Sequence, residues 1–131
     1  DCLPPDVVDY LAELNQRLYL WVELGLQTTY ESTSDKINRA HDYPTYVDAV
    51  ARLRKHNINV CTHLINGLPD ESLEMMRENV RRTILDSDIQ GIKLHLLHLM
   101  RNTKMLRDYA EGHLRSIRAD SSRNYYSSFD R

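Results

Sequence analysis

The sequence predicts an α/β fold in which parallel strands alternate with helices, as in part of a TIM-like (βα) barrel. Residues 18–27, 58–66 and 91–99 are rich in apolar strand formers, and amphipathic segments separate them. Strands that alternate with helices of about 12 residues favour parallel pairing through right-handed crossovers. Each predicted strand has one apolar face and one face with ionisable residues, whereas the strands of an open parallel sheet are apolar on both faces. This pattern favours a barrel wall whose inner face surrounds a ligand.

The first helices are predicted from proline and cap residues. Pro4 and Pro5 begin the first helix, because proline suits the first helical turn. Residues 31–40 contain serine and aspartate caps and predict a short helix or turn. Pro44 then opens a longer helix that extends to about Lys55, with apolar residues at helical spacing.

Two further helices are expected after the second and third strands. Asp70, Glu71 and Ser72 open one of them, since acidic residues are favoured at the positive end of a helix dipole. A last helix is expected from about Lys104 to Glu111. The residues expected to face inward from the helix after Ser72 are Leu73, Met76, Val80 and Ile84.

Alternation along the strands separates their side chains into two sets, because successive residues point to opposite faces. The apolar set, which we expect under the helices, is Val22, Leu24, Leu26, Val60, Thr62, Leu64, Ile92, Leu94 and Leu96. The opposite set is Trp21, Glu23, Gly25, Gln27, Asn59, Cys61, His63, Ile65, Lys93, His95 and Leu97. The ionisable members of the second set should therefore share the inner face of the wall.

Polar residues and a glycine stand at the carboxyl ends of the predicted strands, where ligands bind in parallel α/β folds. Gln27 ends the first strand, Asn66 and Gly67 end the second, and His98 lies at the end of the third. Glycine has no Cβ and lets a planar ligand approach the backbone. The sequence thus predicts a ligand site at this edge of the sheet.

Composition narrows the class of protein. The 131 residues fit one domain or a piece of one. A net charge of -2, from 17 basic and 19 acidic residues, gives no reason to expect a nucleic-acid partner. No apolar run approaches the ~18 residues of a membrane span, and no signal-peptide pattern is present. Cys2 and Cys61 are too few for a disulfide framework, so the reducing cytoplasm is the expected location.

The length is too short for a closed barrel. An eight-unit barrel needs about 250 residues, so at most about four βα units fit this chain. We therefore expect either a fragment or a chain that assembles with another copy. A partial barrel exposes sheet edges and an apolar face, which predicts a homo-oligomer that covers them.

The motifs "ELGLQTT", "INRAHD", "VCTHLINGLPDES" and "GIKLHLLHL" occur in this order and at mutually consistent spacing. Together they resemble the second half of the barrel core of radical S-adenosylmethionine (radical SAM) enzymes, over roughly residues 1–112. The subfamily that they resemble is bacterial and is related to the elongator-type tRNA-modifying members and the oxygen-independent coproporphyrinogen oxidases. Residues 113–131 depart from the resemblance and predict a divergent or disordered tail.

The resemblance implies a partial (βα)6 barrel with S-adenosylmethionine (SAM) across the strand ends. In such enzymes SAM chelates one iron of a [4Fe–4S] cluster and is cleaved reductively to start radical chemistry, here on an unknown substrate with an analogy to RNA modification. The protein positions and shields the cofactor, which carries the chemistry. The family's Cys-x3-Cys-x2-Cys motif is absent, and Cys2 with Cys61 lack its number and spacing. This chain alone is therefore expected neither to hold the cluster nor to cleave SAM.

The resemblance also implies roles for polar residues. Gln27 matches a residue at the end of the fourth barrel strand that contacts the ribose or methionine of SAM, and its amide can donate and accept at once. Arg39 matches an arginine that grips the methionine carboxylate, which a guanidinium does with two parallel hydrogen bonds. His63 stands where related enzymes often have an acidic residue that faces the ribose hydroxyls.

The remaining residues implied by the resemblance line the base and the lumen. Ile65 and Gly67 match the fifth-strand pattern that lies along the adenine of SAM. Leu97, on the sixth strand, is a further apolar neighbour of that base. Glu23 and His95 are expected deeper on the lumen face, where they contact SAM or substrate.

The residues by themselves leave other functions open. One is a cluster-free α/β module that binds a nucleotide-like ligand or a protein partner without catalysis. Another is an unrelated enzyme that uses Glu23, His63 and His95 for acid/base chemistry. His95 and His98 point to opposite faces of their strand, which makes them a poor metal pair, and no metal site is favoured. Cys61 with His63 and His95 would be the ligands of a three-residue zinc site across neighbouring strands.

Overall fold

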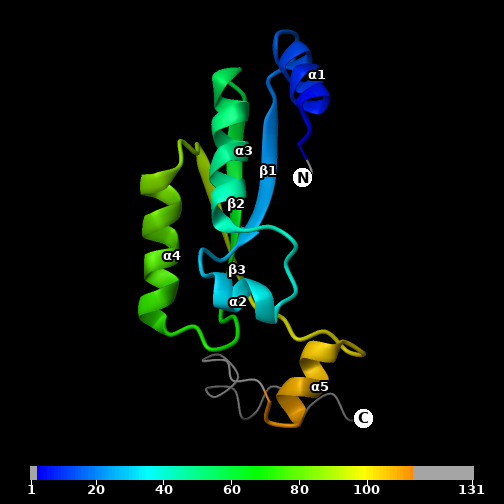
Figure 1. Cartoon of the computed structure of the whole chain (residues 1–131), viewed down its shortest axis with the longest axis vertical. Coiled ribbons are helices and arrows are strands. Elements are labelled where there is room, and N and C mark those ends of the chain that lie inside the picture. Colours follow the sequence, from blue (N-terminus) through cyan, green and yellow to red (C-terminus); the bar gives the residue numbers. More distant parts are fainter. Residues whose placement is uncertain (1–2, 114–131) are drawn as a thin grey trace.

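The computed structural model describes residues 3–113, in which helices and strands alternate (Figure 1). The elements are α1 (Pro5–Asn15), β1 (Trp21–Gln27), α2 (Glu31–Lys36), α3 (Tyr43–Lys55), β2 (Asn59–Asn66), α4 (Leu73–Asp86), β3 (Gly91–Leu96) and α5 (Lys104–Ala110). This order is the predicted one. The first and third strands are shorter than predicted, because residues 18–20 and 97–99 lie outside them.

The strands form one parallel sheet in the order β1-β2-β3, which confirms the predicted α/β fold with parallel strands. Glu23 of β1 is the partner of Cys61 on β2, and Cys61 is in turn the partner of Gly91 on β3. The register between β1 and β2 shifts between Gly25 and Gln27, at the carboxyl end of β1. Within residues 3–113, β1 and β3 are the edges of the sheet.

The core lies between the sheet and the helices that cover one of its faces. Both α3 and α4 pack on β2, and α1 contacts α3. Leu53 of α3, Ile58 just before β2 and Val60 of β2 are 0% exposed, and Leu26 of β1 is buried with them. The apolar strand face predicted to lie under the helices therefore does so along β1 and β2.

The inward face of α4 matches the predicted one only in part, since Val80 packs against the core. Leu73 and Ile84, expected to face inward, are 56% and 54% exposed, whereas Asn79 and Thr83 are buried. Both polar side chains are buried with hydrogen-bond partners, as burial requires. For example, Thr83 Oγ1 donates to the Asn79 carbonyl at 2.8 Å. The prediction was wrong at Leu73 and Ile84, because the hydrogen bonds of Asn79 and Thr83 select the fully buried positions of this helix.

The start of α4 also departs from the prediction. Ser72 is its cap and accepts a hydrogen bond from the Met75 amide at 3.2 Å. Glu71 lies before the helix and is 2% exposed, so its carboxylate is a buried group rather than a solvated partner of the helix dipole. Asp70 is exposed and forms an ion pair with Lys36 at the end of α2.

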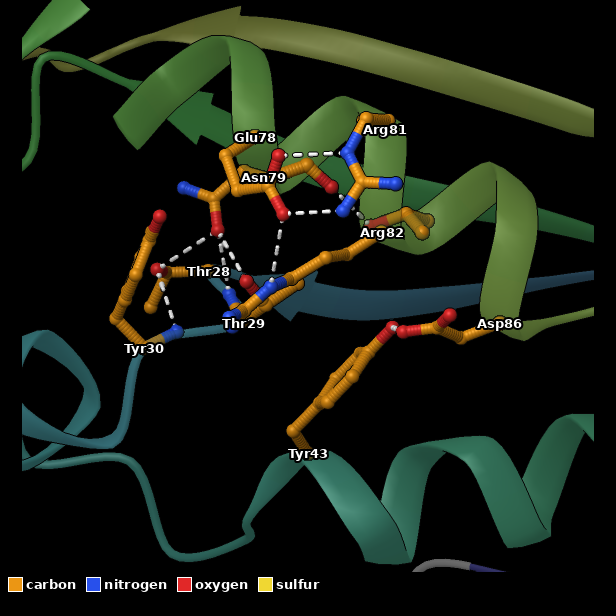
Figure 2. Close-up of polar contacts among 10 residues, drawn as sticks. Thr28, Thr29, Tyr30, Tyr43, Glu78, Asn79, Arg81, Arg82 and Asp86 are labelled. Atoms are coloured by element: carbon orange, nitrogen blue, oxygen red, sulfur yellow. Dashed lines mark hydrogen bonds and ion pairs between the residues drawn. The ribbon is translucent and has the colours of Figure 1, made fainter. Parts of the chain in front are cut away.

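The Glu71 carboxylate joins the segments that follow β1 and β2. Thr28 Oγ1 donates to Glu71 Oε1, and Asn79 Nδ2 donates to Glu71 Oε2 at 3.0 Å. Asn79 Oδ1 accepts from the Thr29 amide and hydroxyl, both at 2.7 Å, and Figure 2 shows this side chain reaching from α4 to residues 28–29. The Tyr30 amide donates to Thr28 Oγ1 at 3.1 Å. These bonds fix the carboxyl end of β1 against the loop that follows β2.

No helix within residues 3–113 is long and apolar enough to cross a membrane. The tail predicted for residues 113–131 lies, apart from His113, outside the described residues.

Leu94 and Leu96 of β3, predicted to lie under helices, are instead 52% and 54% exposed. The reason is that β3 is an edge strand here and the helices pack on β2.

Truncation of Leu53 tests the position of the core. We expect Leu53→Ala to lower the free energy of unfolding by about 2–5 kcal/mol, because it leaves a cavity at a fully buried site. Leu85→Ala is the matched control, since this leucine of α4 is 66% exposed and a surface change costs within about 0.5 kcal/mol. Urea unfolding followed by circular dichroism measures both. Equal losses in the two variants would contradict this core.

Removal of the buried carboxylate tests the network around Glu71. We expect Glu71→Ala to cost about 1–3 kcal/mol for each buried group left unpaired, namely the Thr28 hydroxyl and the Asn79 amide. Asp70→Asn changes the neighbouring, exposed carboxylate and should cost no more than about 1 kcal/mol, as for a surface ion pair. The same unfolding measurement applies. A loss for Asp70→Asn as large as for Glu71→Ala would show that the buried bonds carry no special weight.

Candidate functional site

Gln27 and Gly25 shape the carboxyl end of β1. We call the edge of the sheet where the strands end the rim. Gln27 has a φ of 74°, a backbone conformation that is uncommon for residues other than glycine. Its side chain folds back over the strand, so that a Cβ added to Gly25 would stand 2.7 Å from Gln27 Nε2. Glycine at position 25 therefore leaves the space that the Gln27 amide occupies.

Arg39 reaches the same place from the loop after α2. Its Nη2 donates to the Gly25 carbonyl and lies 3.3 Å from His41 Nε2. Its Nε is buried and has no hydrogen-bond partner among the described residues. Buried donors are nearly always paired, so an ordered water or a ligand is expected to supply the acceptor. The guanidinium and the Gln27 amide thus form a polar pair at the end of β1.

A polar cavity of about 360 Å³ adjoins Arg39 between α2 and the start of α3. Its lining is Thr28, Thr29, Tyr30, Glu31, Ser34, Asp35, Arg39, Ala40, His41, Asp42 and Tyr43. Neither Gln27 nor Gly67 contributes to it. The inner face of the sheet is an open surface over the described residues, because three strands do not close on themselves.

The ends of β2 and β3 bring apolar residues and a glycine together. Ile65 is the register partner of His95, and both point to the inner face with Leu97 two residues further on. Gly67 has a φ of 87°, which glycine adopts without strain, and it is buried. The Leu97 amide donates to the Asn66 carbonyl at 2.9 Å, so Leu97 and Gly67 lie at adjoining strand ends.

The ionisable residues of the inner face form a connected chain. His63 Nε2 lies 2.8 Å from Glu23 Oε2, and His63 Nδ1 lies 2.9 Å from His95 Nε2, with the imidazole rings stacked. Lys93 Nζ forms an ion pair with Glu23 Oε1. The Lys93 ammonium, and after it His63, lower the pKa of the Glu23 carboxyl, and Glu23 in turn raises the pKa of Lys93. Sheet register therefore gathers the predicted lumen residues on one face.

The structure thus divides the predicted site residues into two groups. The rim group comprises Gln27, Arg39, Ile65, Gly67 and Leu97. The inner-face group comprises Glu23, His63 and His95. His98, noted at a strand end, is exposed beyond β3.

The residues that hold the rim in place were not predicted from the sequence. Glu71 was assigned to the helix dipole, and Thr28 and Asn79 were given no role. The sequence did contain a signal: Glu71 follows the Gly-Leu-Pro turn, and the next helix has a single asparagine, Asn79. A buried asparagine needs partners, and Glu71 with Thr29 supplies them.

A [4Fe–4S] cluster does not fit the residues present. Residues 3–113 contain one cysteine, Cys61, which is buried in the middle of β2. Cluster ligation requires several thiolates, so no group of described residues supplies them. The rim fits SAM better, because Arg39 has an unpaired buried donor for a carboxylate beside an amide that donates and accepts.

Comparison with known proteins gives close relatives. The chain is 58% identical over 120 residues to the uncharacterized protein YtqA of Bacillus subtilis, and the match covers 92% of this chain and 37% of YtqA. It is 37% identical over 118 residues to protein YhcC of Escherichia coli, with 89% of this chain and 38% of YhcC covered. The chain therefore spans little more than a third of the length of these relatives.

More distant matches include a heme chaperone and a tRNA acetyltransferase. Heme chaperone HemW of Lactococcus lactis is 29% identical, with 80% of this chain and 28% of HemW covered. A tRNA uridine(34) acetyltransferase of Methanocaldococcus infernus is 25% identical, with 87% of this chain and 23% of that protein covered.

A solved structure confirms the partial barrel fold. The Elp3 protein of Methanocaldococcus infernus, with an N-terminal deletion, matches with a TM-score of 0.76 at 20% sequence identity. The match covers 86% of this chain and 26% of that one. The family described as "Radical SAM superfamily" matches residues 1–83, well over half of the sequence. The chain belongs to the radical SAM superfamily.

Proposed function

We propose that this chain is the SAM-contacting half of a radical SAM barrel, and that its rim binds the methionine end and the adenine of SAM. The observation that carries the proposal is the unpaired, buried Nε of Arg39 beside the Gln27 amide at the end of β1. SAM offers a carboxylate to the first group and polar atoms to the second. Both groups stand at the edge of the sheet where parallel α/β folds bind ligands.

Each rim residue has a chemical role in this proposal. The Arg39 guanidinium holds the methionine carboxylate through charge-assisted hydrogen bonds. Gln27 donates to and accepts from the ribose or methionine. Ile65 and Leu97 line the adenine, and Gly67 lets the base approach the backbone. His63 faces the ribose side, while Glu23 and His95 extend the polar surface beneath the cofactor.

The radical step needs parts that lie outside this chain. When bound beside a [4Fe–4S] cluster, SAM supplies the radical that starts the family's chemistry, and the ligands of that cluster are absent from these residues. The work proposed for this chain is to bind, orient and shield SAM in a reducing, cytoplasmic setting. An RNA-related substrate is proposed for the intact protein by analogy with the tRNA-modifying relative.

A second function competes with the first. The alternative is a cluster-free module that binds a nucleotide-like ligand without catalysis. The two proposals differ at Arg39, because adenosine carries no carboxylate for its guanidinium. Separate measurements of SAM and adenosine binding therefore distinguish them.

Replacement of Arg39 tests the carboxylate contact. We expect Arg39→Ala to weaken SAM binding by roughly 10- to 100-fold, since a hydrogen bond to a charged group contributes about 1.5–3 kcal/mol. Adenosine binding should not change. Calorimetry on the whole chain measures both ligands, and Arg77→Ala, an exposed arginine of α4, is the control. Equal weakening of SAM and adenosine would contradict the contact, and binding of both that is insensitive to Arg39 would favour the nucleotide module.

Exposed apolar residues of β3 support a proposed assembly of this chain with a second copy. We expect a second copy of this chain to cover the edge formed by β3, where Leu94 and Leu96 are exposed. Light scattering at increasing concentration should then give a mass above the 15.4 kDa of one chain. Leu94→Lys should shift the population towards the single chain. A single species of 15.4 kDa at high concentration would rule out this assembly.

A further inference from the structure

Three side chains of different chemistry converge on the inner face of the sheet, deeper than the rim. The ligand atoms of Glu23, Cys61 and His63 all lie within 4.8 Å of one another. We propose that these three residues bind a divalent transition-metal ion, with Zn²⁺ as the expected occupant. This site adds a metal to the proposed function. It shares Glu23 and His63 with the proposed SAM surface and does not involve the Gln27 and Arg39 pair.

Sheet register builds the site. Glu23 and Cys61 are direct partners across β1 and β2, and His63 follows Cys61 by two residues, so all three side chains leave the same face. Gly91 of β3 stands opposite Cys61, and a Cβ there would lie 3.3 Å from Cys61 Sγ and 3.1 Å from the Trp21 ring. The absence of a side chain at Gly91 therefore gives the thiol its place. Backbone pairing, rather than a mobile loop, sets the positions of all three ligands.

The donor set suits zinc. Thiolate, imidazole and carboxylate are the ligands that Zn²⁺ takes, at about 2.3 Å for sulfur and about 2.0–2.2 Å for nitrogen and oxygen. Ligand atoms at those lengths on a tetrahedron lie about 3.5 Å apart, so side-chain adjustments of about 1 Å complete the geometry. A metal ion would take the place of the contact between His63 Nε2 and Glu23 Oε2. The charges of a thiolate and a carboxylate would balance those of the ion.

Two neighbouring side chains, His95 and Lys93, contact the proposed ligands and orient them. His63 Nδ1 lies 2.9 Å from His95 Nε2, a contact that orients the imidazole and leaves Nε2 for the metal. Lys93 holds Glu23 Oε1 and leaves Oε2 free to coordinate. His95 is thus a positioning residue rather than a ligand, which differs from the zinc set of Cys61, His63 and His95 considered from the sequence. The three protein ligands leave a fourth position for water or substrate, as in catalytic zinc sites.

Titration with Co²⁺ tests the site, because a cobalt–thiolate bond gives a charge-transfer band in the near ultraviolet. The whole chain, kept reduced and free of oxygen, should bind one Co²⁺ with this band and should lose it on addition of Zn²⁺. We expect Cys61→Ser to abolish the band and Cys2→Ser, the matched cysteine control, to retain it. His95→Phe should weaken metal binding roughly 10- to 100-fold, as expected for a residue that orients a ligand, while the exposed His98→Phe should not.

Two further variants keep the test decisive. Circular dichroism shows whether Cys61→Ser folds, and if it does not, Glu23→Gln carries the test, because the Glu23 side chain is 48% exposed and the change leaves the core intact. Loss of Co²⁺ binding in Glu23→Gln supports the site. Arg39→Ala should keep the band, so failure of the SAM proposal and failure of this one are read separately.

Three outcomes would overturn the proposal. One is a thiolate band that persists in Cys61→Ser, and another is a band that disappears in Cys2→Ser. The third is Co²⁺ binding without a thiolate band that is lost in His113→Gln. That result would assign the ion to Asp108, Glu111 and His113, a second group whose ligand atoms lie within 4.8 Å of one another.

Discussion

The buried carboxylate of Glu71 is the constraint on which the arrangement of the rim depends. It lies in the segment after β2, yet its partners are Thr28, directly after β1, and Asn79 on α4. A buried carboxyl group is tolerated only when its polar atoms are hydrogen-bonded, so these elements must meet in one arrangement. Gln27, at the end of β1, comes directly before Thr28, and Gly67, at the end of β2, comes a few residues before Glu71. The network therefore fixes the two strand ends relative to each other.

The fixed backbone in turn positions the polar side chains of the rim. With the end of β1 held, Gln27 adopts a positive φ and folds over Gly25, where a larger residue would collide with its amide. Arg39 then completes the pair by donating to the carbonyl of Gly25. Strain of this kind is maintained only where the surrounding structure over-determines it, and it is common where ligands bind. The rim thus combines a structural arginine contact with an unpaired donor.

The side chains of the inner face are positioned by strand pairing and not by a single buried group. Residues of equal parity on β1, β2 and β3 face the same side, and the register brings Glu23, His63 and His95 into contact. Lys93 holds the pKa of Glu23 below its usual range, so this carboxylate stays ionised over a wide pH range. Glu23, Cys61 and His63 bring three kinds of metal-binding atom within 4.8 Å of one another on this face.

The sequence by itself determined the order of the elements, the parallel sheet and the polar set of the inner face, because strand alternation and helix caps are local signals. It also carried motifs specific enough to place the chain in its family. Only the tertiary structure decided that Glu71 is buried, that Asn79 rather than Leu73 faces inward, and that Leu94 is exposed. Those outcomes depend on which distant groups come together, on hydrogen bonds between segments more than 40 residues apart and on which strand lies at the edge, and no local pattern contains that information.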